Sequence, residues 1–186
     1  EDGQVGTVFN GEIYNHAELR IDLARRGHSF ASDHSDTEIL VHGYEEWGND
    51  LPLRLNGMFA FAILDRRRRQ LFLARDRFGE KPLYYCVLPG LFAFASELTA
   101  LARHAHVPRS IDVTSLQKFF AWGYLPAPRA MLQGTAKLPG GHWLRYDLDR
   151  GTTTVRPFWQ FALEPDSSLG NADEPRLVEE CASLIQ

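Results

Sequence analysis

A change in the spacing of apolar residues near position 57 is the feature that most limits the folds open to this chain. Before it, apolar residues recur at helical intervals over 16–26 and again over 36–47. After it come short apolar or aromatic runs bounded by turn residues, at 58–64, 70–74, 83–88 and 91–95. This order predicts an α+β fold, with an antiparallel meander covered by helices. It disfavours the alternating units of a Rossmann-type sheet.

Further segments extend this outline. The run 58–64 is apolar at nearly every position, which is typical of a strand buried on both faces. Residues 97–105 and 114–122 are expected to be helices, the second with Thr114 as its N-cap. Asp149-Arg150-Gly151 predicts the turn of a late hairpin.

Length and charge exclude several classes of protein. The 186 residues, 44% of them hydrophobic, suffice for one domain with a substantial core. A net charge of −4 gives no general attraction to nucleic acid or anionic membranes, and we expect neither as a partner. No apolar run is long enough to span a bilayer. The two cysteines, Cys86 and Cys181, lie far apart, which fits a reducing, cytoplasmic location. Cys86, among apolar strand residues, is expected to be a buried structural thiol.

The segment from Val8 to Asn15 is the first candidate for chemistry. Its Asn10-Gly11 pair predicts that a strand over 5–9 ends in a tight turn, because both residues tolerate positive φ. Asn15 stands three residues before Glu18, the capping-box spacing that opens a helix. Such a turn presents a side-chain amide and a backbone N–H to one point, as an oxyanion hole requires. On the dipeptide alone, an ordinary strand–helix connection is the simpler interpretation.

Two acidic positions and one longer motif each have two interpretations. Ser35 and Glu38 form a second capping box that places Asp36 in a first helical turn, where the helix dipole stabilises a carboxylate. Asp36 is either a favourable first-turn acid or a ligand for an ammonium group, and Glu12 has the same ambiguity. The segment 75–85 is either a polar network that braces a turn, which its spacing favours, or an anion site.

Other polar residues have simpler interpretations. Residues 66–69 are all arginine and predict an exposed hairpin turn. They lack the interleaved aromatic residues that are typical of a nucleic-acid site. The seven histidines show no metal-ligand spacing, so we expect solvated histidines and no metal site.

Five motifs then occur in an order that resembles a known family. They are 9–15 (FNGEIYN), 35–38 (SDTE), 57–62 (GMFAFA), 75–85 (RDRFGEKPLYY) and 94–98 (FASEL). Together they resemble the glutaminase domain of the glutamine-hydrolysing asparagine synthetases, which are class II (N-terminal-nucleophile) glutamine amidotransferases. The resemblance covers nearly the whole chain.

The resemblance implies a fold and a set of roles. The fold would be a four-layer αββα sandwich of the Ntn-hydrolase type, with L-glutamine bound at one edge. An N-terminal cysteine, with its own α-amino group as base, would attack the glutamine amide and release ammonia. Residue by residue, Asn10 and Gly11 match the oxyanion hole, Gly11 and Glu12 the glutamine-contacting turn, and Asp36 the acid that holds the substrate ammonium.

The resemblance also implies parts that this sequence does not contain. Residues 1–163 would be the amidotransferase domain, and 164–186 a linker and the start of a helix leading to a C-terminal synthetase domain. The Cys-Gly-Ile opening of the family is absent, so we expect a fragment that is inactive as written. ATP and Mg²⁺ are implied for the synthetase domain and no cofactor for this one. The acceptor would be aspartate or a related carboxylate, and a homodimer is possible.

A second function remains open at this point. A domain that lacks the nucleophile would serve as a non-catalytic scaffold, binding glutamine or a protein partner without chemistry.

Overall fold

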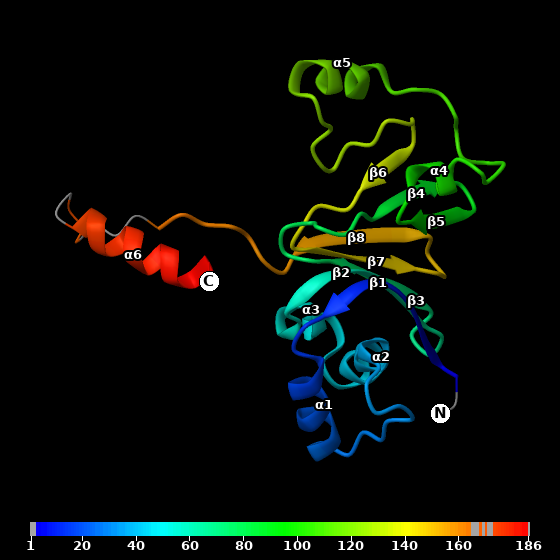
Figure 1. Ribbon diagram of the computed structural model, residues 1–186. Helices are drawn as coiled ribbons and strands as arrows, with labels where there is room; N and C mark the ends of the chain where they lie inside the picture. Colours follow the sequence, from blue (N-terminus) through cyan, green and yellow to red (C-terminus); the bar gives the residue numbers. More distant parts are fainter. Residues whose placement is uncertain (1–2, 165–167, 169, 171–172, 186) are drawn as a thin grey trace.

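Two antiparallel sheets form the centre of the molecule in a computed structural model that describes residues 3–164, 168, 170 and 173–185 (Figure 1). The five-stranded sheet has the spatial order β1 (Val5–Ile13), β2 (Gly57–Asp65), β3 (Gln70–Arg75), β7 (His142–Asp147) and β8 (Thr152–Pro157). The three-stranded sheet has the order β5 (Leu91–Ala95), β4 (Tyr84–Leu88) and β6 (Thr135–Lys137). Among the described residues, no helix has the length and apolarity that crossing a membrane requires.

Helices cover the outer faces of these sheets. The face of the larger sheet that points away from the smaller one carries α1 (His16–Arg25), α2 (Asp36–Trp47), η1 (Gly48–Asp50) and α3 (Leu51–Arg54) (Figure 1). Beyond the smaller sheet lie α4 (Leu98–Leu101) and α5 (Val113–Trp122), the latter largely exposed. The last helix, α6 (Glu174–Ile185), stands apart from both sheets in the same view. The α+β sandwich is therefore confirmed, with a sparse outer layer over the smaller sheet.

Two apolar clusters hold the layers together. The first lies between the larger sheet and its helices and includes Leu23, Leu40 and Phe61. The second lies between the two sheets and includes Ala62 and Leu144. Strand β2 contributes to both clusters, and its residues 59–63 are all buried. The prediction of a strand buried on both faces is confirmed, because continuous apolarity is what two covered faces require.

The predicted meander is wrong in one respect. β2 and β3 form one hairpin and β4 and β5 another, but β3 pairs with β7 and the chain crosses to the second sheet before β4. The short β6, with the sequence Thr-Ala-Lys, was not expected. Its pairing with β4 is a long-range contact that local sequence does not encode.

Helix boundaries also differ from expectation. The helix expected over 97–105 is the single short α4. The N-cap of α5 is Asp112, not Thr114, and its carboxylate accepts the Ser115 N–H at 2.7 Å. The late hairpin and the exposed turn at 66–69 are as predicted. Part of the expected linker over 164–174, together with Gln186, lies outside the described residues.

Strand β1 does not end at Asn10-Gly11, which corrects the predicted turn. Its nine residues pair with β2 without interruption, from Val5 opposite Asp65 to Ile13 opposite Gly57. Gly11 has φ of +145°, and a Cβ there would collide with the Met58 carbonyl of β2. Glycine is therefore needed for close approach of two strands rather than for chain reversal.

Helix α1 begins where predicted, but the expected capping hydrogen bond from the Asn15 side chain does not form. Asn15 makes no side-chain capping bond to the helix. Its Oδ1 accepts the Asn56 N–H and its Nδ2 donates to the Arg54 carbonyl, both at 2.9 Å. The amide thus fastens the end of β1 to the segment that enters β2.

Candidate active site

The open edge of β1 presents backbone N–H groups that do not face the sheet. Opposite residues in an antiparallel pair exchange either both ladder hydrogen bonds or neither. Phe59, opposite Gly11, directs both its N–H and its carbonyl to Asp76 on the far side of β2. In the same register the Tyr14 N–H does bond to the Asn56 carbonyl. The backbone N–H and carbonyl groups of the even-numbered residues of β1 therefore point toward β2, and the N–H of Gly11 points to the open edge.

The carboxylate of Asp36 accepts a hydrogen bond from another of these N–H groups at the edge of β1. Its Oδ2 accepts the Ile13 N–H at 3.2 Å, which brings the first turn of α2 against the end of β1. Ser35 is the N-cap of α2 and its side chain accepts the Glu38 N–H, so the second capping box is confirmed in this half. Asp36 is half-buried and lies at the positive end of the helix dipole.

Asn10 lies where the two sheets meet. Its Nδ2 donates to Ser96 Oγ at 3.1 Å, and Ser96 follows the end of β5 in the other sheet. Both residues line a cavity of about 180 Å³ whose other walls include Phe94 and Leu83. The sequence offers no separate signal for Ser96 as a site residue, although it falls within the fifth motif, 94–98, at the end of β5. Its hydroxyl orients the Asn10 amide at the edge of the sheet.

The structure therefore brings the four predicted site residues to one end of β1. Asn10 and Glu12 point to the same face because side chains alternate along a strand. Gly11 lies between them, and Asp36 is hydrogen-bonded one residue beyond Glu12. Asn10 and Ile13 are three residues apart, a span of about 10 Å.

The segment 75–85 is a structural brace, as its spacing favoured. Arg75 is 8% exposed and its guanidinium donates to the carbonyls of Lys81, Leu138 and Gly79. Burial lowers the pKa of this guanidinium. Asp76 is 1% exposed and accepts the N–H groups of Phe59, Glu80 and Lys81. Because these two buried charged groups are held by several backbone partners, the bracing role accounts for both of them.

Neither cysteine lies at this edge. Cys86 is 1% exposed in the middle of β4, as predicted, and burial raises the pKa of its thiol. A raised pKa lowers the thiolate fraction, which is the nucleophilic form. Cys181 is exposed on α6.

The prediction of solvated histidines is wrong for His42, which is 4% exposed on α2. Together with His28 and Glu45 it forms the group of neighbouring side chains whose donor atoms suit a metal ion, within the part of the chain that the structure describes. These residues lie on the helical layer and not at the β1 edge.

Comparison with known proteins agrees with this architecture. The profile of the glutamine amidotransferase domain family matches residues 1–159. Asparagine synthetase [glutamine-hydrolyzing] 3 of Bacillus subtilis (strain 168) is 40% identical over 143 residues, covering 76% of this chain and 23% of that protein. A putative asparagine synthetase [glutamine-hydrolyzing] of Mycobacterium bovis is 38% identical over 185 residues, covering 96% of this chain and 28% of its own length.

A solved structure shows the same fold. The glutamine phosphoribosylpyrophosphate amidotransferase of B. subtilis superposes with a TM-score of 0.58 at 20% sequence identity, over 87% of this chain and 30% of that one. This chain thus spans about a quarter of the length of the curated relatives above, which are 23% and 28% covered. On the match over residues 1–159, the chain belongs to the glutamine amidotransferase domain family and is homologous to part of the glutamine-hydrolysing asparagine synthetases.

Proposed function

We propose that this domain hydrolyses L-glutamine to glutamate and ammonia, and that the ammonia serves an ATP-dependent amidation of aspartate or a related carboxylate elsewhere in a longer protein. The observation that carries the proposal is the convergence of three polar groups at the end of β1. There the Asn10 amide, the outward N–H of Gly11 and the carboxylate of Asp36 lie along one open strand edge. The printed names of the relatives support glutamine as the substrate.

Each residue has a distinct role in this proposal. The carboxylate of Asp36 binds the α-ammonium group of glutamine, and the Gly11–Glu12 backbone contacts the substrate. The Asn10 Nδ2 and the Gly11 N–H donate hydrogen bonds to the oxyanion that forms when the glutamine amide carbon is attacked. Removing one such donor costs about 2.7–4 kcal/mol of barrier stabilisation. Ser96 is a positioning residue in this proposal, because its hydroxyl accepts a hydrogen bond from the Asn10 amide.

The attacking cysteine is proposed to come from residues that are not part of this sequence. Cys86 is buried in β4, and Cys181 lies on α6, which stands apart from the sheets. We therefore expect the 186-residue chain alone to release no glutamate from glutamine. We also propose 1–163 as the catalytic domain and 164–186 as the connection to a synthetase domain, where ATP and Mg²⁺ would act.

Kinetics of a full-length protein that contains this chain test the proposal. Asn10→Ala should lower kcat for glutamine hydrolysis by about 10²–10³-fold, because one oxyanion donor is lost. Activity supported by added ammonia should remain at the wild-type level, since ammonia bypasses the glutaminase step. Asn15→Ala is the matched control, because this neighbouring amide bonds only to the backbone of residues 54 and 56 in the contacts described above.

The same measurement separates the proposed enzyme from the scaffold. Glutamine binding without glutamate release by the full-length wild type would favour the non-catalytic alternative. Wild-type turnover in Asn10→Ala would remove Asn10 from the oxyanion hole.

A further inference from the structure

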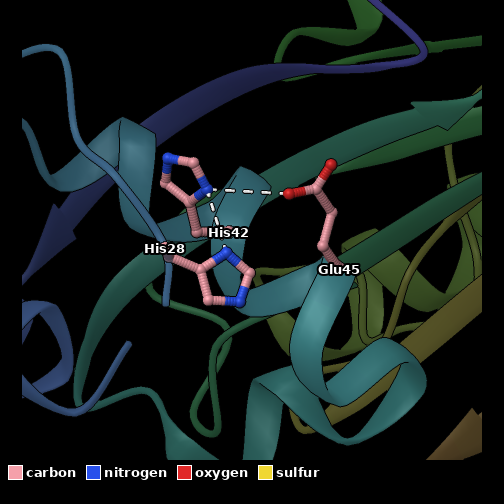
Figure 2. A group of neighbouring side chains, drawn as sticks. All are labelled: His28, His42 and Glu45. Carbon is pink, nitrogen blue, oxygen red and sulfur yellow. Dashed lines mark hydrogen bonds and ion pairs between the residues drawn. The ribbon is translucent and has the colours of Figure 1, made fainter. Parts of the chain in front are cut away.

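Two histidines and a glutamate meet on the helical layer, away from the β1 edge (Figure 2). His28 follows the end of α1, and His42 and Glu45 lie one turn apart on α2. The Nδ1 atoms of the two histidines are 3.3 Å apart, and His42 Nδ1 is 3.6 Å from Glu45 Oε2. All three donor atoms lie within 4.8 Å of one another.

These separations match the edges of a metal coordination tetrahedron. Zinc binds histidine nitrogen at about 2.0–2.1 Å and carboxylate oxygen at about 2.0–2.2 Å, so neighbouring ligand atoms in a tetrahedral site are about 3.3–3.5 Å apart. Two of the three donor pairs have nearly this spacing as they stand. The Glu45 side chain is 42% exposed, so it has room to rotate and bring its oxygen to the third edge.

The other ring nitrogen of each histidine faces a second carboxylate. His28 Nε2 is within hydrogen-bond distance of Glu46 Oε2, at 3.3 Å, whereas His42 Nε2 is 3.7 Å from Glu38 Oε1, an ion-pair separation longer than a hydrogen bond. Histidines that ligate metals almost always direct their second nitrogen to a carboxylate, a carbonyl or water, which fixes the tautomer and raises the basicity of the ligating nitrogen. This arrangement turns both Nδ1 atoms toward the same point.

The neighbouring charges define which carboxylate is the ligand. Glu38 already accepts the N–H groups of Ala31 and Ser32 and the Ser32 hydroxyl. Glu46 is paired with Arg26 at 3.0 Å. Glu45 extends from the exposed side of α2 and meets His42, so it completes the donor set. Three glutamates around two imidazole rings also provide the negative charge that a dication requires.

The surroundings give the group one dry side and one open side. The Phe30 ring packs edge-on against His42, with centroids 4.6 Å apart, and the His42 side chain is 5% exposed. The His28 side chain is 17% exposed and that of Glu45 is 42% exposed. A water molecule can therefore occupy the fourth position of a tetrahedral ion.

We propose that His28, His42 and Glu45 form a binding site for a divalent transition-metal ion, with Zn²⁺ as the best match to the donor set. The ion links the end of α1 to the middle of α2. Its expected effect is to stabilise the helical layer, and this holds whether or not the β1 edge hydrolyses glutamine.

Calorimetric titration of the chelator-treated protein with ZnCl₂ tests the proposal. The wild type should bind one ion per chain at this site. His28→Gln and Glu45→Gln should each weaken binding by more than tenfold, because each removes a ligand. The double variant His104→Gln/His106→Gln is the matched control, since these two exposed rings also pack together, with centroids 5.5 Å apart. It should bind zinc as the wild type does.

A second variant tests the positioning carboxylate. Glu46→Gln should weaken zinc binding by about 10–100-fold, as losses in the outer shell of metal sites do. Zinc should raise the Tm of the wild type and of the His104/His106 control, and should leave the Tm of Glu45→Gln unchanged. CoCl₂ should give the wild type the visible absorption of a tetrahedral site.

Two results would overturn the site. One is zinc affinity in Glu45→Gln and His28→Gln equal to that of the wild type. The other is loss of binding in the His104/His106 control alone, which would place the ion on that exposed pair. Glu45 lies on the solvent face of a helix, so its variant remains informative if His28→Gln fails to fold.

Discussion

Asp36 and Asp76 both accept hydrogen bonds from backbone N–H groups of the β1–β2 pair, yet their carboxylates differ in burial and in the number of hydrogen bonds they accept. Asp36 Oδ2 accepts the Ile13 N–H and Asp76 Oδ2 accepts the Phe59 N–H, each at 3.2 Å. Asp76 accepts two further N–H groups and is 1% exposed. Asp36 is half-buried, and its Oδ1 is 3.4 Å from the Thr37 hydroxyl.

The difference lies in how much acceptor capacity each carboxylate has left, and it is what we expect if Asp76 is structural and Asp36 binds a ligand as proposed. An ionised carboxylate has about four acceptor sites. Those of Asp76 are directed at protein donors that hold the turn after β3, whereas Asp36 keeps acceptor capacity at the open edge of β1. Two aspartates that each accept a backbone N–H from the same pair of strands thus differ in how much acceptor capacity remains.

Loss of Asp76 should have the largest effect on stability. Asp76→Ala leaves the buried Phe59 N–H without its acceptor and removes the carboxylate beside the buried Arg75. We expect the free energy of unfolding to fall by about 3–5 kcal/mol, measured by urea denaturation. A loss below about 1 kcal/mol would show that the turn does not depend on this carboxylate.

Loss of the Glu38 carboxylate, which lies on α2 like that of Asp36, should have an intermediate and pH-dependent effect on stability. Burial alone would raise its pKa, but hydrogen bonds from the Ser32 side chain and from the backbone of Ala31 and Ser32 outweigh burial and lower the pKa from 4.5 to about 2. The lowered pKa in the folded state means that its stabilisation is complete above about pH 4.5 and is lost as the pH falls toward 2.

Glu38→Gln should therefore reduce stability at pH 7 by about 1–3 kcal/mol and flatten the acid limb of the stability curve. Urea denaturation at a series of pH values measures both. The exposed α1 residue Glu18, changed to Gln, is the matched control. An acid limb in Glu38→Gln as steep as in the wild type would contradict the assignment.

Asp36→Asn should have the smallest effect on folding. The amide oxygen keeps an acceptor for the Ile13 N–H, so the free energy of unfolding should change by less than about 1 kcal/mol. Equilibrium denaturation beside Asp76→Ala measures this directly. If both variants lose several kcal/mol, Asp36 is structural and the contrast between the two carboxylates fails.

Local patterns predicted the elements better than they predicted the contacts between them. The Ser35–Glu38 spacing located the start of α2 because capping involves neighbouring residues only. The Asn10-Gly11 dipeptide predicts a turn, but the strand continues through it because nine consecutive pairings with β2 outweigh the turn preference of one dipeptide. The amide of Asn15 is bonded to residues 54 and 56 instead of to its own helix, a contact that only the folded sheet creates.

Residue spacing alone does not predict the proposed site, and the family resemblance is what points to its residues. Asn10 and Gly11 are neighbours on β1, but Asp36 comes from α2, and its approach to them depends on the docking of α2 against β1. Ser96 is 86 residues from Asn10 in sequence, and its contact depends on how the two sheets pack. The burial of His42 against Phe30 is likewise a tertiary contact without a signature in histidine spacing.

The most direct test of the central claim is the glutamine dependence of Asp36→Asn in a full-length protein that contains this chain. The neutral amide loses a charge-assisted bond to the substrate ammonium, which is worth about 1.5–3 kcal/mol. We expect kcat/KM for glutamine to fall by about tenfold or more. Activity with added ammonia and the free energy of unfolding should stay near wild type. Unchanged kcat/KM for glutamine would contradict a glutamine site at this edge of β1.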